Sequence, residues 1–270
     1  MKQTELAAGY LEEKLEDTRC EILPMKTTGD TQVAWSLEKQ GGKGLFTKEL
    51  EQALLDGRAD LAVHSAKDMP TEEVEGLKLA GFLPRELAGD VFVSREDCSH
   101  IGEIATSSPR RRAQAKRLYP KVCWSEIRGN VETRLNKIAR GTADATIVAA
   151  AGLKRLNISE FPGLQFEPIR VDEMIPAAGQ GAIAIQSRAD EADKFGALFC
   201  DETRHAVTIE RLMLSRLGGG CHTAVGVHFH ENELLLFHED HGSHRFPFKA
   251  SKEEDIAAQL DKIYETVFKS

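Results

Sequence analysis

Short apolar segments alternate with amphipathic helical segments in the middle of the chain, and this alternation restricts the possible folds more than any other feature. Strand patterns at Ile104–Ser107, Val122–Ile127 and Ala145–Ala150 are separated by helical patterns at Arg110–Leu118 and Val131–Arg140. A strand that is followed by a helix usually returns parallel to its neighbour. This order therefore predicts an α/β unit with a parallel sheet.

The first part of the chain has a similar texture, interrupted by a polar, glycine-rich segment at residues 26–44 that is typical of a mobile loop. The pattern predicts helices at 4–15 and Phe46–Asp56. It predicts strands at Glu21–Met25, Asp60–Ser65, Leu77–Phe82, Val91–Val93 and, later in the chain, Ala182–Gln186. These elements indicate a second α/β unit.

The last part of the chain differs from the rest. Helical patterns at 191–199 and 203–217 are followed by a glycine-rich break at 218–220. Three short strands then read as an antiparallel meander, at Val225–His230, Leu234–His238 and Arg245–Lys249, before a final helix at 253–268. A length of 270 residues allows this small α+β unit beside two larger ones, at roughly 150 residues per domain.

Charge is unevenly distributed along the chain. The net charge is −8, yet residues 104–156 hold twelve Lys or Arg against three Asp or Glu, a local charge of +9. Such a cluster is either a solvated helix face or a surface that converges on one anion. Because these arginines recur at the starts of successive elements, and because guanidinium groups bind carboxylates with two parallel hydrogen bonds, we favour an anionic ligand.

Composition excludes several classes of protein. No apolar run approaches the roughly 20 residues of a membrane span, the first residues show no secretory signal, and the acidic total argues against a nucleic-acid binder. The five cysteines are scattered without a CxxC pair, so we expect a reducing cytoplasm and neither disulfides nor zinc. We interpret the histidines of residues 222–244 as surface residues and expect no metal site.

Three motifs could carry chemistry. His64–Pro70 follows a short strand, where Asp68 could stabilise a cation and Lys67 could hold a carboxylate, although such a turn is often only a turn. Thr106–Arg111 joins a hydroxyl-rich turn to a helix start, which fits either an anion site or a simple helix cap. Cys221 follows three glycines and is either a nucleophile or attachment point, or a small buried residue.

Taken together, these motifs resemble the porphobilinogen deaminase (hydroxymethylbilane synthase) family. The matching segments occur in the family's order and extend from about residue 5 to 230. They are Gly41–Leu50, Ala62–Pro70, Thr106–Arg111, Ile127–Leu135, Ala151–Leu156, Ala178–Ala182, and Glu210–Arg211 leading to Gly219–Cys221.

The resemblance implies an α/β fold of three domains, the first two similar to the lobes of a type II periplasmic binding protein with a cleft between them. Residues 1–83 and 178–198 would form domain 1, which would lack the family's first strand. Residues 88–174 would form domain 2, with the basic face of the cleft. Residues 201–270 would form a small α+β domain 3 that carries the cysteine loop.

The resemblance also implies the activity. Family members are cytoplasmic, usually monomeric transferases of tetrapyrrole and heme biosynthesis. They condense four porphobilinogen molecules head to tail into hydroxymethylbilane and release ammonia. A dipyrromethane cofactor would be attached to Cys221 through a thioether. No nucleic acid or membrane partner is expected.

Residue roles follow from the same resemblance. Asp68 would be the catalytic residue and would stabilise the cationic azafulvene formed by deamination. The cofactor would be bound by Cys221, Lys43, Lys67, Asp68, Ser108, Arg110 and Arg111, and the substrate by Phe46, Arg128, Asn130, Arg134 and Arg155.

The sequence departs from the family pattern at its start. Family members begin with a strand and a Thr-Arg-x-Ser-x-Leu-Ala stretch, and Met1 falls just after that stretch. We therefore keep an alternative: an N-terminally truncated, inactive family member that acts at most as a carboxylate-binding protein.

Overall fold

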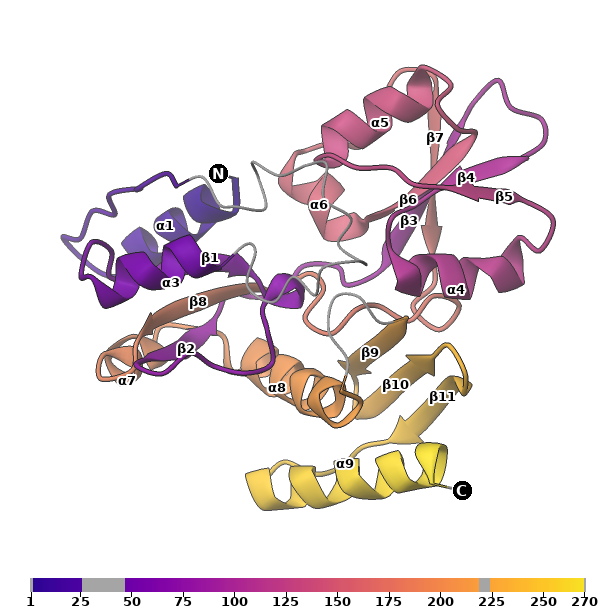
Figure 1. The fold of residues 1–270 in the computed structure, drawn as a ribbon. Helices are drawn as coiled ribbons and strands as arrows, with labels where there is room; N and C mark the ends of the chain where they lie inside the picture. Colours follow the sequence, from indigo (N-terminus) through magenta and orange to yellow (C-terminus); the bar gives the residue numbers. More distant parts are fainter. Residues whose placement is uncertain (1, 26–46, 219–223, 270) are drawn as a thin grey trace.

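The computed structural model describes residues 2–25, 47–218 and 224–269. Two α/β lobes lie side by side above a smaller third unit, and the chain passes between the lobes twice (Figure 1). The expected α/β class, with two lobes and a small α+β unit, is confirmed.

The first lobe is built on a three-stranded sheet in the order β1-β8-β2, with both pairs antiparallel. Its strands are β1 (Ala62–Ser65), β2 (Leu77–Phe82) and β8 (Ile183–Arg188), and its helices are α1 (Lys2–Lys14), α3 (Lys48–Leu55) and α7 (Ala192–Gly196). Ala7 and Leu11 of α1 pack against Ile185 and Phe199 because they share one face of the helix.

The predicted strand at Glu21–Met25 is wrong, since residues 21–25 belong to no strand. A strand needs a neighbour that completes its backbone hydrogen bonds. Strands β1 and β2 lie at the two edges of this sheet, and neither pairs with residues 21–25.

The second lobe contains a five-stranded sheet in the order β5-β4-β6-β3-β7. Its strands are β3 (Asp90–Arg95), β4 (Glu103–Ala105), β5 (Cys123–Ser125), β6 (Ala145–Ala149) and β7 (Leu164–Ile169). Its helices are α4 (Pro109–Leu118), α5 (Val131–Ala139) and α6 (Ala150–Arg155). Buried apolar residues of α5 and the sheet, such as Leu135, Ile138 and Val93, form its core.

The prediction of parallel sheets is correct only for β5, β4 and β6. Strand β3 is antiparallel to both of its neighbours, and so is β8 in the first lobe. Each of these strands follows a crossover from the other lobe and enters its sheet from the opposite end. Helix α6 and strand β7 were not predicted, because α6 is short and β7 alternates with exposed polar residues.

Two crossover segments, residues 83–89 and 170–182, join the lobes. The backbone N–H of Glu86 donates to Gly181 O at 3.2 Å, so the crossovers touch directly. Gly181 has φ +87°, and a Cβ there would lie 2.5 Å from Glu86 O. Glycine is therefore required where the crossovers meet.

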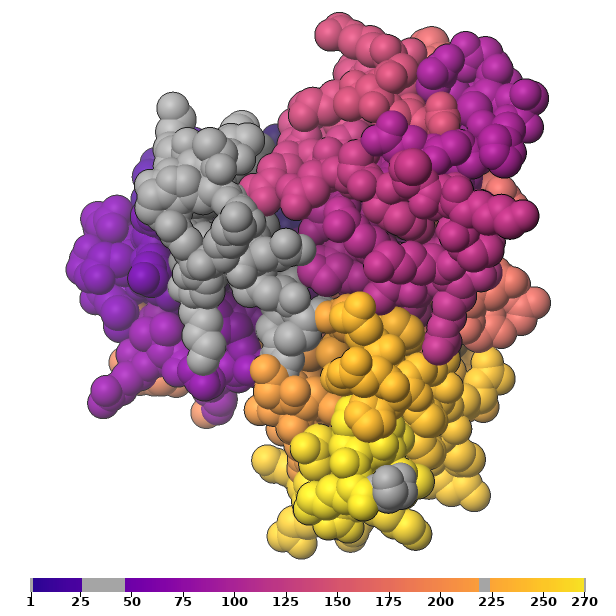
Figure 2. All heavy atoms as spheres, turned by 45° about the vertical axis from the view of Figure 1, so that its right-hand side comes forward, coloured from indigo at the N-terminus to yellow at the C-terminus, as the bar shows by residue number. Residues whose placement is uncertain are grey.

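The third unit consists of α8 (Asp201–Arg216), β9 (Val225–His230), β10 (Glu233–His238), β11 (Gly242–Pro247) and α9 (Glu253–Phe268). The three strands form the expected antiparallel meander and pack on α8 and α9. Strand β11 begins three residues before its predicted start at Arg245, because pairing with β10 also includes the polar residues 242–244. In Figure 2 this unit, orange to yellow, adjoins the magenta second lobe.

Glu210 of α8 ties the third unit to both crossovers. Arg85 donates to both of its carboxylate oxygens, at 2.7 and 3.0 Å, and the N–H groups of Gly179 and Phe229 donate at 2.7 and 2.8 Å. Burial alone would raise the pKa of Glu210, but Arg85 and His228 lower it below its usual value. This buried carboxylate stays ionised and joins three segments that are distant in sequence.

Among the described helices, none combines the length and the apolar character that a membrane crossing requires.

Gly226→Ala should destabilise the chain by about 1–3 kcal/mol, because the new methyl group would lie 2.6 Å from Ile175 O and push β9 off the second crossover. Gly9→Ala is the control. No atom lies within 4 Å of a Cβ there, and the change should stabilise α1 by about 0.5–1 kcal/mol. Urea unfolding of both variants measures the difference, and equal stabilities would contradict the account.

Candidate functional site

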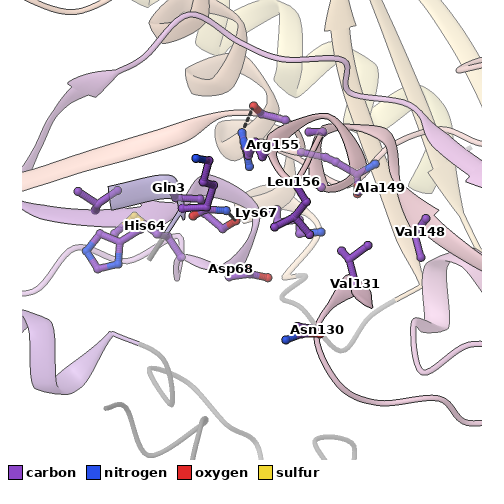
Figure 3. Close-up of a pocket in the computed structure, with 18 of the residues that line it drawn as sticks. Gln3, His64, Lys67, Asp68, Asn130, Val131, Val148, Ala149, Arg155 and Leu156 are labelled. Carbon is purple, nitrogen blue, oxygen red and sulfur yellow. Dashed lines mark hydrogen bonds between the residues drawn. The ribbon is translucent and has the colours of Figure 1, made fainter. Parts of the chain in front are cut away.

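A cleft of about 620 Å³ lies between the two lobes. Its first-lobe wall includes Gln3, His64, Lys67 and Asp68, which Figure 3 shows across an open space from Asn130 and Val131 of the second lobe. Other lining residues of the second lobe and the second crossover are Arg111, Arg134, Arg155, Gln180 and Gly181. The cleft thus brings together residues separated by up to about 180 positions in the sequence.

Lys67 and Asp68 lie in a short 3-10 turn, Ala66–Asp68, at the carboxyl end of β1. Arg211 clamps the residues that follow, with Nη2 donating to Pro70 O at 2.6 Å. Asp68 is exposed, and its carboxylate is directed into the cleft (Figure 3). Burial lowers the pKa of Lys67, while Asp68 opposes that shift. The turn therefore presents a cation and a carboxylate side by side.

Ser108 and Asn130 both act as helix caps. Ser108 Oγ accepts from the N–H of Arg111 at the start of α4, and Asn130 Oδ1 accepts from the N–H of Thr133 at 2.8 Å at the start of α5. Asn130 also lines the cleft, whereas Ser108 is not among the lining residues. Ser108 is therefore a helix cap in the structure, and its predicted role in binding the cofactor stays a prediction.

Arg110 and Arg111 differ in position although they are adjacent. Arg111 lines the cleft, but Arg110 does not. Both pair with the buried carboxylate of Asp90, at 2.7 and 2.8 Å. The predicted pair of ligand-binding arginines therefore includes one guanidinium that lies behind the cleft wall.

Arg134 and Arg155 bring positive charge to the cleft. Arg134 donates from Nε to Gly129 O at 2.7 Å and makes no ion pair within the described ranges, and burial lowers its pKa to about 10. Arg155 donates to Gly181 O at 2.6 Å, its buried Nε has no acceptor, and burial lowers its pKa too. Both guanidinium groups line the cleft, where they are placed to bind a carboxylate from outside the chain.

Arg128 pairs with Glu126 at 3.6 Å and is not a lining residue of the cleft. Lys43, Phe46 and Cys221, which were predicted at the site, lie outside the described residues. No group of three His, Cys, Asp or Glu in the described part of the chain could hold a metal ion.

Several residues that the structure places at the site had no predicted role. Gln3 donates to Ser65 Oγ at 3.1 Å on the first-lobe wall, and Gln180 lines the cleft from the second crossover. An isolated glutamine in a helix or loop has no distinctive spacing. Asp90 also lacked a signal, because it begins an ordinary apolar strand.

His64 is buried in the first-lobe wall of the cleft. Its segment, His64–Pro70, is recognisable in the sequence, but the sequence predicts no role for the imidazole. Its Nε2 lies 3.0 Å from Gln186 Oε1, across the pairing of β1 and β8. Burial lowers the pKa of His64 to about 4, although the bond to Gln186 opposes this. His64 is therefore neutral at pH 7 and adds no charge to the cleft.

Known proteins resemble this chain over most of its length. Residues 1–195 match the family model described as "Porphobilinogen deaminase, dipyromethane cofactor binding domain". Porphobilinogen deaminase of Chromobacterium violaceum is 47% identical over 216 residues, which is 76% of this chain and 68% of that protein. The enzyme of the same name from a Caulobacter species is 43% identical over 227 residues, 82% of this chain and 70% of that protein.

Solved structures resemble the chain more loosely. An ancestral arginine-binding protein bound to arginine matches 75% of this chain and 81% of its own, with 14% identity and a TM-score of 0.42. A likeness of this degree carries no argument about the site.

The burial of His64 makes stability depend on pH. The unfolded chain binds a proton near pH 6.5 and the folded chain only near 4, so stability falls as the pH drops through this window. At 1.36 kcal/mol per pKa unit the loss is about 3 kcal/mol. His64→Gln should remove this part of the pH dependence, whereas His230→Gln, at an exposed position, should not. Denaturant unfolding at pH 7 and pH 4 measures the change in unfolding free energy between the two pH values. The same change in the native chain and in His64→Gln would refute the role of His64.

Proposed function

Because this chain belongs to the porphobilinogen deaminase family, we propose that the cleft between its lobes is where porphobilinogen units are joined into hydroxymethylbilane. Family membership makes the chain a transferase of heme biosynthesis, with porphobilinogen as substrate and a dipyrromethane cofactor. The assignment of individual residues to steps of the reaction is our proposal.

The observation that carries the proposal is positive charge in the cleft that the described chain leaves unpaired. Porphobilinogen has an acetate and a propionate side chain, so every added unit brings two carboxylates. Within the described residues, Arg134 and Arg155 donate to backbone carbonyls and make no ion pair. Both guanidinium groups line the cleft, where a substrate carboxylate would supply a negative charge beside them.

The same side chains fit the cofactor, which is also a pyrrole carboxylate. Lys67 and Arg111 face the cleft, and we propose that they hold its carboxylates, with Lys43 and Ser108 as further candidates. Attachment to Cys221 follows from the family resemblance alone. When bound, the dipyrromethane supplies the pyrrole carbon to which the first porphobilinogen unit is joined.

We assign the central chemical role to Asp68. When the amino group of porphobilinogen leaves as ammonia, positive charge develops on the substrate. A carboxylate fixed at that position stabilises the charge by electrostatic attraction, and it can accept hydrogen bonds from pyrrole N–H groups. The short turn at the end of β1 contains Asp68, and Arg211 donates to the backbone of Pro70 that follows it, which supports this role.

The remaining assignments are also proposals. Asn130, Arg134 and Arg155 would bind substrate carboxylates from the second lobe, and Arg128 and Phe46 would assist from outside the described lining. We keep the three domains at 1–83 with 178–198, 88–174, and 201–270. We further propose hydroxymethylbilane synthase activity in the cytoplasm, by a monomer that requires neither nucleic acid nor membrane.

Asp68→Asn should lower the rate of porphobilinogen consumption by about 100-fold or more, because it removes the charge that stabilises the developing cation. Binding of porphobilinogen should be unchanged or tighter, since the variant cleft is more positive. Glu75→Gln, an exposed change in the following loop, is the control and should retain activity. Turnover and calorimetric binding are measured together. Full turnover by Asp68→Asn would overturn the assignment.

Cys221→Ala should abolish a covalent adduct that the native chain carries. Intact mass spectrometry of the purified native chain is expected to show the sequence mass plus one dipyrromethane. Cys123→Ala, at an exposed cysteine, should keep the adduct. A native chain of unmodified mass, or an adduct that survives in Cys221→Ala, would contradict the attachment site.

A further inference from the structure

A single buried carboxylate, that of Asp90, lies behind the cleft wall at the point where the first crossover enters the second lobe. Asp90 is 1% exposed and begins β3. No motif in the sequence indicated it. Its neighbours connect it both to the cleft and to the second crossover.

Asp90 holds the cleft-lining Arg111 in one orientation. Nε and Nη2 of Arg111 donate to Asp90 Oδ1 at 3.2 and 2.8 Å. Nη1 donates to Ile147 O, in the neighbouring strand β6, at 3.0 Å. Arg111 thus donates three hydrogen bonds to residues of β3 and β6, and these bonds hold the guanidinium plane in one orientation.

The other carboxylate oxygen of Asp90, Oδ2, also accepts a hydrogen bond. Arg110 Nη2 donates to Oδ2 at 2.7 Å, and its Nη1 donates to Ile175 O at 2.7 Å. Gln180 Nε2 donates to Asp90 Oδ1 at 2.9 Å and to Ala88 O at 2.6 Å. Asp90 is therefore bonded to α4 and to the second crossover at the same time.

We propose that Asp90 is a positioning residue, which fixes the Arg111 guanidinium at the angle needed to take a carboxylate of the pyrrole chain. This inference rests on the proposed function, because it concerns how that cleft binds its ligand. Asp90 itself does not line the cleft, whereas Arg111 does. Two arginines share the one carboxylate of Asp90, so the cluster keeps a net positive charge. Asp90 therefore orients Arg111 without cancelling the positive charge of the cluster.

Two explanations of Asp90 make opposite predictions. If only charge matters, Asp90→Asn makes the cleft more positive and should raise kcat/KM for porphobilinogen. If Asp90 positions Arg111, the same change removes bonds to the guanidinium and should lower kcat/KM by about tenfold or more. The sign of the change distinguishes the two explanations.

A double-mutant cycle separates positioning from general stability. Asp90→Asn, Arg111→Gln and the double variant are compared by kcat/KM, using the full chain with its cofactor. If Asp90 acts through Arg111, the double variant should be no slower than Arg111→Gln alone. Losses that simply add, or a higher kcat/KM in Asp90→Asn, would overturn the proposal.

Gln114→Met is the matched control. Gln114 joins the same helix α4 to the same crossover through two bonds with Ile175, at 3.0 and 2.7 Å, but does not line the cleft. This variant should lower the melting temperature and leave kcat/KM unchanged. A fall in kcat/KM as large as that of Asp90→Asn would mean that loosening α4 is sufficient, and would overturn the proposal.

If Asp90→Asn does not fold, Asp90→Glu takes its place in the cycle. It keeps the charge and displaces the carboxylate by one methylene, so positioning predicts a loss of kcat/KM and charge alone predicts none. Failure of the native chain to consume porphobilinogen would refute the proposed function. A native chain that turns over, with additive losses in the cycle, would refute only the inference about Asp90.

Discussion

Buried positive charge is the constraint on which the cleft depends, and the described residues leave Arg134 and Arg155 without an ion pair. Removing cations from water is costly, and the effect is visible in the lowered pKa values of Lys67, Arg134 and Arg155. Backbone carbonyls compensate some of this cost without adding negative charge, as Gly129 O does for Arg134. A cleft built in this way favours ligands that bring their own carboxylates, and it does so inside a chain whose total charge is −8.

Arg111 and Arg155, two of the cleft arginines, are connected to the segments that join the lobes. Arg155 donates to Gly181 O, the adjacent Lys154 pairs with Glu86 at 2.6 Å, and Asp90 links Arg111 to the second crossover through Gln180. Glu210 extends the connection from the first crossover to the third unit. Fold and site are therefore not separable here, because the bonds that orient the cations also fix the relative position of the lobes.

Local patterns in the sequence predicted most elements and the turn that carries Lys67 and Asp68. These local patterns failed where a partner that is distant in the sequence determines the structure. Residues 21–25 have a strand-like composition but no adjacent strand, and β11 takes its register from β10. At the site, the cluster of arginines was recognisable from composition, but the difference between Arg110 and Arg111 depends on Asp90, 20 positions earlier. Gln3 had no signal in the sequence, and Gln180, although it lies in the recognised segment Ala178–Ala182, is placed at the cleft only by the structure.

The most direct test of the account is the stoichiometry of ammonia release by the full chain supplied with porphobilinogen. The account predicts one ammonia for each porphobilinogen consumed, together with a linear tetrapyrrole product. Saturable binding of porphobilinogen with no release of ammonia would contradict it, and would leave a carboxylate-binding protein that has the cleft without the chemistry.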